Sequence, residues 1–234
     1  MENKLPPGQQ AISDFPRFGA PRNVNRLPEI PPRFAIKLDT GDGVARTLGI
    51  DDFTPLPRRE IVADFHCVAT WTHRNLHWEG YAFRDVYQQL IAPHVHGDAK
   101  LDYVEFKALD GYKSCIVLAD LLDENVLLAD RLEGAPLARD HGAPLRLVVP
   151  HLYGYKNVKH VCAIRLCAQF RRSSTEKMTR AHPRGRVALE ERGRGLPAPI
   201  YRVLYRAVFP LILWVYRRAE RRRSPSARAL DLPF

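Results

Sequence analysis

Residues 140–160 read DHGAPLRLVVPHLYGYKNVKH, a turn, an apolar strand and a glycine-containing loop in close succession. Arg146 lies in the apolar run of residues 144–149, where a charge without a partner would be costly to bury. In the loop, Lys156 and Lys159 are three residues apart, so one helical turn would place them on the same face. These groups together predict an oxyanion-binding site, with phosphate as the expected ligand.

Each of these features has a simpler interpretation when taken alone. The two lysines could be solvated surface residues, and Arg146 could form an ion pair with Asp140. The anion site is preferred because both features occur within one short segment.

Apolar runs on either side of this stretch predict the fold class. An amphipathic helix is expected where apolar residues follow helical spacing, at Phe83, Val86, Tyr87, Leu90 and Ile91. A shorter helical turn is expected at 118–123. Strands are expected at 34–38, 59–69, 101–109, 114–118, 144–149 and 160–166, which are rich in Val, Ile and Phe. Strands with a few helices predict an α+β domain.

The chain divides into three parts. Residues 1–33 are proline-rich and are expected to form an extended arm without elements of its own. Residues 34–170 form the predicted domain. Residues 171–234 form a basic tail with an amphipathic helix.

The net charge of +10 resides in that tail. Residues 1–170 contain 20 basic and 21 acidic residues, whereas residues 171–234 contain 16 and 5. The apolar centre at 207–216 is too short to span a bilayer, so we expect residues 196–223 either to contact an anionic membrane peripherally or to pack on the domain. Nucleic-acid binding is not expected, because no readout motif accompanies the charge.

The four cysteines show neither a C-x-x-C pair nor zinc-site spacing, which is typical of reduced thiols in a cytoplasmic protein. The N-terminal residues show no apolar signal core, so export is not expected. Cys67 follows a predicted strand, with His66 before it and His73 and Arg74 after it. It is either inert core, the commoner case, or a thiolate that a metal or positive neighbours keep ionised.

Several separated motifs carry a family resemblance. They are C-V-x-x-W at 67–71, D-G-Y at 110–112, V-L-L-A at 126–129, G-x-P-L at 134–137 and the run at 141–160. Over about residues 25–166 the chain resembles the molybdopterin-binding oxidoreductase domain of the sulfite oxidase family. The resemblance implies an α+β, mixed-sheet fold of the sulfite oxidase type and a molybdenum–molybdopterin cofactor.

The resemblance also implies roles for individual residues. Cys67 would be the one protein ligand of molybdenum, a thiolate alongside two pterin sulfurs. Substrate positioning is expected from Tyr153 and Arg74, with His73 and Tyr155 as further candidates, although packing or solvation explains each of these four equally well. The residues implied to hold the pterin are Asn25, Pro28, Glu29, His66, Cys67, His141, Arg146, Asn157, Val158 through its backbone, and Lys159.

The implied function is that of an oxidoreductase that transfers an oxygen atom to or from a small sulfur- or nitrogen-containing substrate. Val24 stands where animal and plant sulfite oxidases have a substrate-binding arginine, which argues against sulfite. The family's methionine sulfoxide reductases also lack that arginine, but they carry an export signal that is not expected here. Electrons would pass to a separate haem, flavin or quinone partner. The alternative is a non-catalytic module that kept the fold and binds an anion or a membrane surface.

Overall fold

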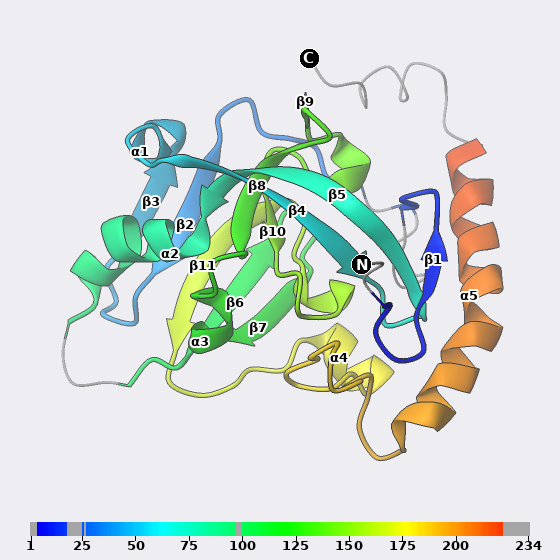
Figure 1. The fold of residues 1–234 in the computed structure, drawn as a ribbon. Helices are drawn as coiled ribbons and strands as arrows, with labels where there is room; N and C mark the ends of the chain where they lie inside the picture. Colours follow the sequence, from blue (N-terminus) through cyan, green and yellow to red (C-terminus); the bar gives the residue numbers. More distant parts are fainter. Residues whose placement is uncertain (1–3, 18–24, 26, 97–99, 222–234) are drawn as a thin grey trace.

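The computed structural model describes residues 4–17, 25, 27–96 and 100–221 (Figure 1). Two mixed β-sheets form the body of the protein, and short helical segments lie at the ends of strands. The predicted α+β architecture is therefore confirmed. The strands are β1 (Gln10–Ile12), β2 (Ala35–Asp39), β3 (Arg46–Gly49), β4 (Arg58–His66), β5 (Trp71–Ala82), β6 (Tyr103–Ala108), β7 (Lys113–Val117), β8 (Leu127–Leu132), β9 (Ala135–Pro136), β10 (Arg146–Val148) and β11 (Val161–Cys167).

The first sheet contains six strands, in the order β1-β5-β8-β10, with β4 paired to β5 and β9 paired to β8. Only β1 runs parallel to its neighbour β5. β5 and β8 approach so closely that a Cβ on Gly80 would lie 2.2 Å from the carbonyl oxygen of Leu128. Glycine is therefore required where the long β5 strand crosses β8.

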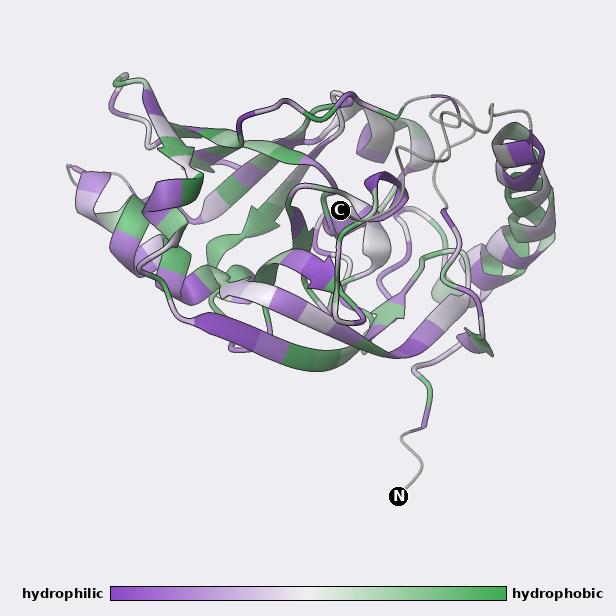
Figure 2. Ribbon diagram, turned by 90° about the horizontal axis from the view of Figure 1, so that it is seen from above, coloured by the Kyte–Doolittle hydropathy of each residue, from purple (hydrophilic) through white to green (hydrophobic). Residues whose placement is uncertain are grey.

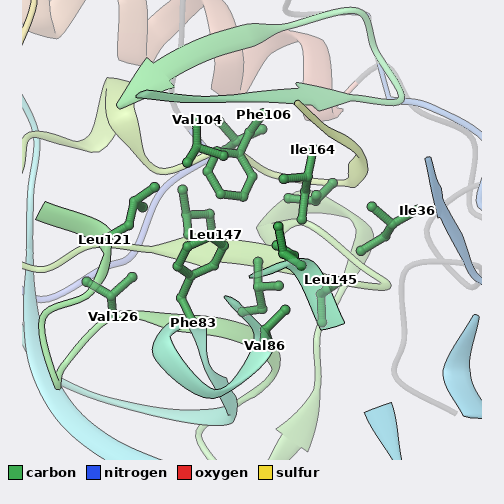
Figure 3. Packing of buried hydrophobic residues seen from close by; sticks show 14 of the residues in the cluster. Ile36, Phe83, Val86, Val104, Phe106, Leu121, Val126, Leu145, Leu147 and Ile164 are labelled. Carbon is green, nitrogen blue, oxygen red and sulfur yellow. The ribbon is translucent and has the colours of Figure 1, made fainter. Parts of the chain in front are cut away.

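The second sheet contains five strands, in the order β3-β2-β11-β6-β7, and only the β2–β11 pair is parallel. Alternate residues of β2 and β6 point inward, as the period of a half-buried strand requires. The main core contains side chains of both sheets, including Ile36, Val104, Phe106, Leu145 and Leu147 (Figure 3). This core fixes the position of β10, the strand that carries Arg146.

The predicted helices are confirmed. α2 (Phe83–Val86) continues into a π-helical turn (Tyr87–Ile91) and a 3-10 turn (Ala92–His94), and α3 (Leu118–Leu121) lies within the predicted second turn. Phe83, Val86 and Ile91 are fully buried, so the amphipathic pattern marked the correct face. The other helical segments are α1 (Ile50–Phe53), 3-10 turns at Arg139–His141 and Gly154–Lys156, α4 (Ser174–Thr179) and α5 (Ala198–Arg221).

The prediction that the arm contains no element of its own is wrong. β1 pairs with the start of β5, with Gln10 opposite Trp71. The side chain of Gln9 donates a hydrogen bond to the carbonyl oxygen of Cys67 at 3.1 Å. The arm forms a strand because the exposed edge at the start of β5 offers unpaired backbone groups.

Residues 171–195 pack on the domain. The backbone N–H of Tyr153 bonds to the carbonyl oxygen of Gly185 at 2.9 Å, and Arg184 forms an ion pair with Asp120 at 2.6 Å. α5 follows and stands beside β1 at the margin of the molecule (Figure 1). Seen from above, α5 carries both hydrophobic and hydrophilic residues (Figure 2).

The expectation that the tail is too short to span a bilayer is contradicted. Residues Ala198–Ala219 form a helix that is long and apolar enough to cross a membrane, by length and composition alone. The prediction counted only the uncharged centre, whereas the continuous helix extends beyond Arg206 on one side and Arg217 on the other. One such helix is weak evidence of a span.

Candidate cofactor site

Arg146 is the centre of a buried cationic cluster. Its guanidinium is fully buried and donates one hydrogen bond, from Nη1 to the carbonyl oxygen of His141 at 2.8 Å. Nε and Nη2 have no acceptor among the described residues. Burial lowers the pKa of Arg146 to about 9. A buried guanidinium with two unused donor atoms is costly, and an anion would satisfy it.

Lys159 and His141 complete the cluster. Nζ of Lys159 donates to the carbonyl oxygen of Asp140 at 2.6 Å. Burial, and then the nearby Arg146, lower the pKa of Lys159 to about 7. Burial and the same cations lower the pKa of His141 to about 3, so its imidazole is neutral at pH 7. Nδ1 of His141 is buried and has no partner among the described residues.

Gly142 allows Arg146 and Lys159 to lie close together. Its φ of +115° lies in the left-handed region, and it ends the 3-10 turn at Arg139–His141. A Cβ at this position would lie 3.1 Å from Cβ of Arg146 and 3.0 Å from Cβ of Lys159. The two basic side chains can be neighbours because residue 142 has no side chain.

An aromatic wall joins this cluster to Cys67. The guanidinium of Arg146 lies 4.8 Å from the ring centroid of Trp78 and 5.5 Å from that of Phe65. The Phe65 ring in turn lies 5.9 Å from that of Trp71, which is in the buried cluster that contains Cys67. Phe15 contacts both groups, with ring centroids 4.8 Å from His141 and 6.4 Å from Trp71.

Cys67 begins the turn between β4 and β5. Its backbone N–H bonds to the carbonyl oxygen of Trp71 at 2.9 Å, and Ala69 directs its N–H at the sulfur from 3.5 Å. Cys67 is 8% exposed, with Phe15, Phe65 and two side chains of α5 packed around its cluster. Burial raises its pKa to about 12, while the Ala69 N–H and Arg192 oppose that rise. Without a metal the sulfur is therefore protonated at neutral pH.

Arg192 was not predicted from the sequence. It is fully buried and donates to the carbonyl oxygen of Val68 at 2.7 Å, within the Cys67 turn. It also bonds to the carbonyl oxygen of Pro7 and lies 5.2 Å from the Tyr153 ring centroid. No sequence signal separated it from the solvated arginines of the tail. It ties the arm, the turn and residue 153 together.

The prediction that Lys156 and Lys159 share one face is wrong. Nζ of Lys156 lies 2.5 Å from Oε1 of Glu176 and 2.9 Å from the carbonyl oxygen of Cys115, away from the Arg146 cluster. The 3-10 turn ends at Lys156, and Asn157 is extended, so helical spacing does not continue to residue 159. Asp140, the alternative partner of Arg146, pairs instead with Arg17 at 3.3 Å.

Asn157 and Val158 form hydrogen bonds that stabilise the loop beside the site. Oδ1 of Asn157 accepts the N–H of Val149 at 2.7 Å, and its amide nitrogen lies 3.4–3.5 Å from three backbone carbonyl oxygens of residues 149–153. Val158 is buried in the main core, and its carbonyl oxygen accepts the N–H of Leu147 at 2.8 Å. A role of either residue in cofactor binding stays a prediction.

The predicted cofactor residues of the arm lie at or near the surface. Asn25 and Glu29 are exposed, and the carbonyl oxygen of Pro28 accepts a hydrogen bond from Arg139 at 2.9 Å. Their pterin contacts stay predictions. Val24, on which the argument against sulfite depends, lies outside the described residues.

The remaining predicted residues surround the Cys67 turn. His66 is buried with Nδ1 2.9 Å from Oγ1 of Thr72, and burial lowers its pKa. Nε2 of His73 lies 3.0 Å from the carbonyl oxygen of Ser13, and Arg74 is half-buried. Tyr153 is buried, and burial raises its pKa to about 12.

Tyr155 does not present its hydroxyl to this site. Its Oη donates to the carbonyl oxygen of His182 at 2.8 Å, and its ring packs against Gly185. Its assignment to substrate positioning has no support in this arrangement.

The donor set fits the proposed cofactor. Nε and Nη2 of Arg146, Nδ1 of His141 and the ammonium of Lys159 suit phosphate oxygens, and the aromatic wall suits a flat ring system. No group of three or more His, Cys, Asp and Glu side chains that could hold a metal occurs in the described part of the chain. Cys67 would contribute a single protein ligand.

The chain is similar to known molybdopterin-binding oxidoreductases. A family model for the oxidoreductase molybdopterin binding domain matches residues 25–175, more than half of the chain. The chain is 36% identical over 112 residues to YuiH, an uncharacterized oxidoreductase of Bacillus subtilis, covering 48% of this chain and 54% of that protein.

Two further relatives have named activities. The chain is 30% identical to sulfite oxidase of Arabidopsis thaliana, over 53% of this chain and 39% of that protein. It is 29% identical to the catalytic subunit of protein-methionine-sulfoxide reductase, MsrP, of Pseudomonas syringae, over 58% and 44%. The matches thus span about half or less of each of these relatives. The chain belongs to the family of oxidoreductase molybdopterin-binding domains, and its cofactor is molybdenum–molybdopterin.

Proposed function

We propose that this domain transfers an oxygen atom to or from a small sulfur- or nitrogen-containing substrate, with Cys67 as the protein ligand of molybdenum. When bound, the cofactor supplies the metal centre that accepts or donates the atom and its two electrons. The observation that carries the proposal is Arg146, which is fully buried yet has two donor nitrogens without an acceptor among the described residues.

The basic cluster would hold the pterin phosphate. Arg146 offers a forked pair of donors. Lys159 adds an ammonium group, and a bound anion would raise its lowered pKa. His141, neutral at pH 7, can donate from Nδ1 in one tautomer. These three groups would hold the phosphate of the cofactor.

The Cys67 turn would hold the metal end. The N–H of Ala69 directed at the sulfur and the buried charge of Arg192 both favour a thiolate over a thiol. A metal that binds the sulfur would displace the thiol proton. The turn itself is fixed by the bonds from Arg192 to Val68 and from Gln9 to Cys67. Tyr153 and Arg74 are the proposed substrate-positioning groups.

An oxygen-atom transfer moves two electrons, so a second redox group must accept or supply them. We place this group on a separate haem, flavin or quinone protein. All four cysteines are free, which supports a reducing compartment, and we propose a cytoplasmic location. Peripheral contact with an anionic membrane through residues 196–223 would bring the domain close to a quinone or membrane cytochrome.

Metal and pterin analysis tests the proposal. The full chain is purified from a host that makes the cofactor, and molybdenum and pterin are measured per chain. We expect about one of each in the wild type and loss of molybdenum in Cys67→Ser. Cys162→Ser, at a half-buried cysteine of β11, is the matched control and should retain both.

The loaded protein is then assayed with sulfite, sulfoxides and N-oxides, using artificial electron carriers. Turnover of one class identifies the substrate and the direction. A wild type that contains neither molybdenum nor pterin would overturn the proposal and favour a non-catalytic anion-binding module. Retention of molybdenum by Cys67→Ser would remove Cys67 as the ligand.

A further inference from the structure

α5 has two apolar faces, and the described residues cover only one of them. Tyr201, Tyr205 and Phe209 face the domain at spacings of four residues. The latter two pack on the Cys67 cluster, and the Phe209 ring lies 6.3 Å from that of Trp71. Further along, Tyr216 is 3% exposed and lies beneath the guanidinium of Arg17 at 5.4 Å. The helix therefore lies along the domain from residue 201 to residue 216.

The opposite face consists of large apolar side chains in solvent. Six residues on it are between 42% and 67% exposed, a contiguous set at helical spacing. Exposed apolar residues grouped in this way mark an interaction surface rather than ordinary surface scatter. We call this set the outer face of α5: Ile200, Val203, Leu204, Val208, Leu211 and Trp214.

The charge on α5 selects the kind of partner. Residues 198–221 contain five arginines and one acidic residue, Glu220. Arg202 is used within the protein, in an ion pair with Glu190 at 2.7 Å. Arg206, Arg218 and Arg221 are exposed around the outer face, and Arg218 lies over the Trp214 ring at 5.4 Å.

We propose that the outer face binds the surface of an anionic lipid bilayer, with α5 parallel to the membrane plane. Apolar side chains that enter the interface while arginines and a tryptophan remain at headgroup level form the pattern of an interfacial helix. The covered face supports a parallel orientation, because α5 is held on the domain over four turns. This inference rests on the membrane contact proposed above and specifies its face and orientation, but it does not depend on the cofactor or on the reaction.

A second copy of the chain fits the outer face less well. A symmetric dimer would bring the same patch of both copies together, and its net positive charge would repel itself. Anionic headgroups instead neutralise the exposed arginines. The orientation also distinguishes surface binding from a span, which would require α5 to leave Trp71 and Arg17.

Vesicle sedimentation tests the proposal with the full chain. Vesicles of phosphatidylcholine are compared with vesicles that contain an equal part of phosphatidylglycerol. We expect strong binding to the anionic vesicles alone, and release at about 1 M salt, where the screening length falls to about 3 Å. Carbonate at high pH should extract the bound protein.

Two variants separate the apolar and the electrostatic contributions. Leu211→Ser/Trp214→Ser should lower vesicle partitioning about tenfold or more. Arg206→Gln/Arg221→Gln should lower it about twenty-five-fold, since each charge contributes about fivefold. The control is Val44→Ser/Val62→Ser, at valines that are 52% and 56% exposed elsewhere on the molecule and should leave binding unchanged. Circular dichroism checks that all variants keep the fold.

Three results would overturn the proposal. Equal binding to uncharged vesicles would remove the electrostatic selection. Resistance to carbonate extraction would show that α5 spans the bilayer. Absence of vesicle binding, together with a dimer in sedimentation that dissociates in Leu211→Ser/Trp214→Ser, would assign the outer face to a second copy.

Discussion

The phenyl ring of Phe15 stacks on the imidazole of His141, with ring centroids 4.8 Å apart and planes inclined by 15°. The same ring contacts Phe65 and Trp71, so an arm residue lies between the cationic cluster and the Cys67 cluster. In the proposed arrangement the cofactor would extend from one of these clusters to the other, past Phe15. We therefore predict that this arm residue slows cofactor entry.

Phe15→Ala should speed cofactor uptake and destabilise the metal-free protein. Loss of a half-buried ring should cost about 2 kcal/mol of unfolding free energy. To measure the uptake rate, metal-free protein is mixed with isolated cofactor, the reaction is stopped at intervals and the bound molybdenum is determined. Phe34→Ala is the matched control, because Phe34 is half-buried in the main core, 5.7 Å from Phe53. If both variants load at the wild-type rate, Phe15 does not obstruct the site.

Local patterns predicted much of the second sheet and the Arg146 cluster. β2, β6, β7 and β11 are apolar runs, so their composition marked them. β5 was missed because Asn75, His77 and Glu79 alternate with buried residues over a mostly polar stretch. Arg146 and Lys159 were predicted to share one anion site because both occur within one short segment, and in the structure the Gly142 turn brings them together.

Long-range contacts were not predictable from local patterns. Arg192 and Phe15 reach the Cys67 turn from segments far away in the sequence, and each belongs to a stretch without a distinctive pattern. Lys156 was wrongly placed in the anion site for the same reason. Its carboxylate partner, Glu176, lies in α4, in a part of the tail for which no helix was predicted.

Glu176→Gln should destabilise the protein strongly. Lys156 and Glu176 have side chains that are 0% and 1% exposed, so the substitution leaves a buried ammonium without its counter-ion. Burial already lowers the pKa of Lys156, and the carboxylate opposes that effect. We expect a loss of about 3 kcal/mol in urea unfolding.

The double variant Lys156→Met/Glu176→Met should recover much of that loss, because it removes both charges. Asp39→Asn, which breaks the exposed ion pair with Arg165, should change stability far less. Equal effects of Glu176→Gln and the double variant would mean that packing, and not charge, accounts for the loss.

Lys159 should give the metal-free protein a pH-dependent stability. Its pKa is about 7 in the folded state and 10.5 in the reference state. Between these values the unfolded chain binds more protons, so stability rises with pH across this window. Below pH 7 both states are protonated, and the cost of the buried charge is fully present.

Lys159→Met should therefore be more stable than the wild type at pH 6, and its advantage should shrink as the pH rises above 7. Urea midpoints measured at several pH values test this, with Lys107→Met at an exposed residue of β6 as the control. A stability difference that is constant with pH would show that the ammonium is not buried as described.

Arg146→Met should have opposite effects on stability and cofactor content. In the metal-free protein it removes a buried charge with two unused donor nitrogens, which should raise the unfolding free energy by about 1 kcal/mol or more. Lost contacts with the Trp78 and Phe65 rings offset part of this gain. Molybdenum and pterin content should fall, because the phosphate loses its forked donor.

Arg58→Met is the control, since Arg58 also lies over an aromatic ring but pairs at the surface with Asp130. That variant should gain no stability and keep its cofactor. A destabilised Arg146→Met that still binds molybdenum would mean that the guanidinium supports the fold and not the cofactor.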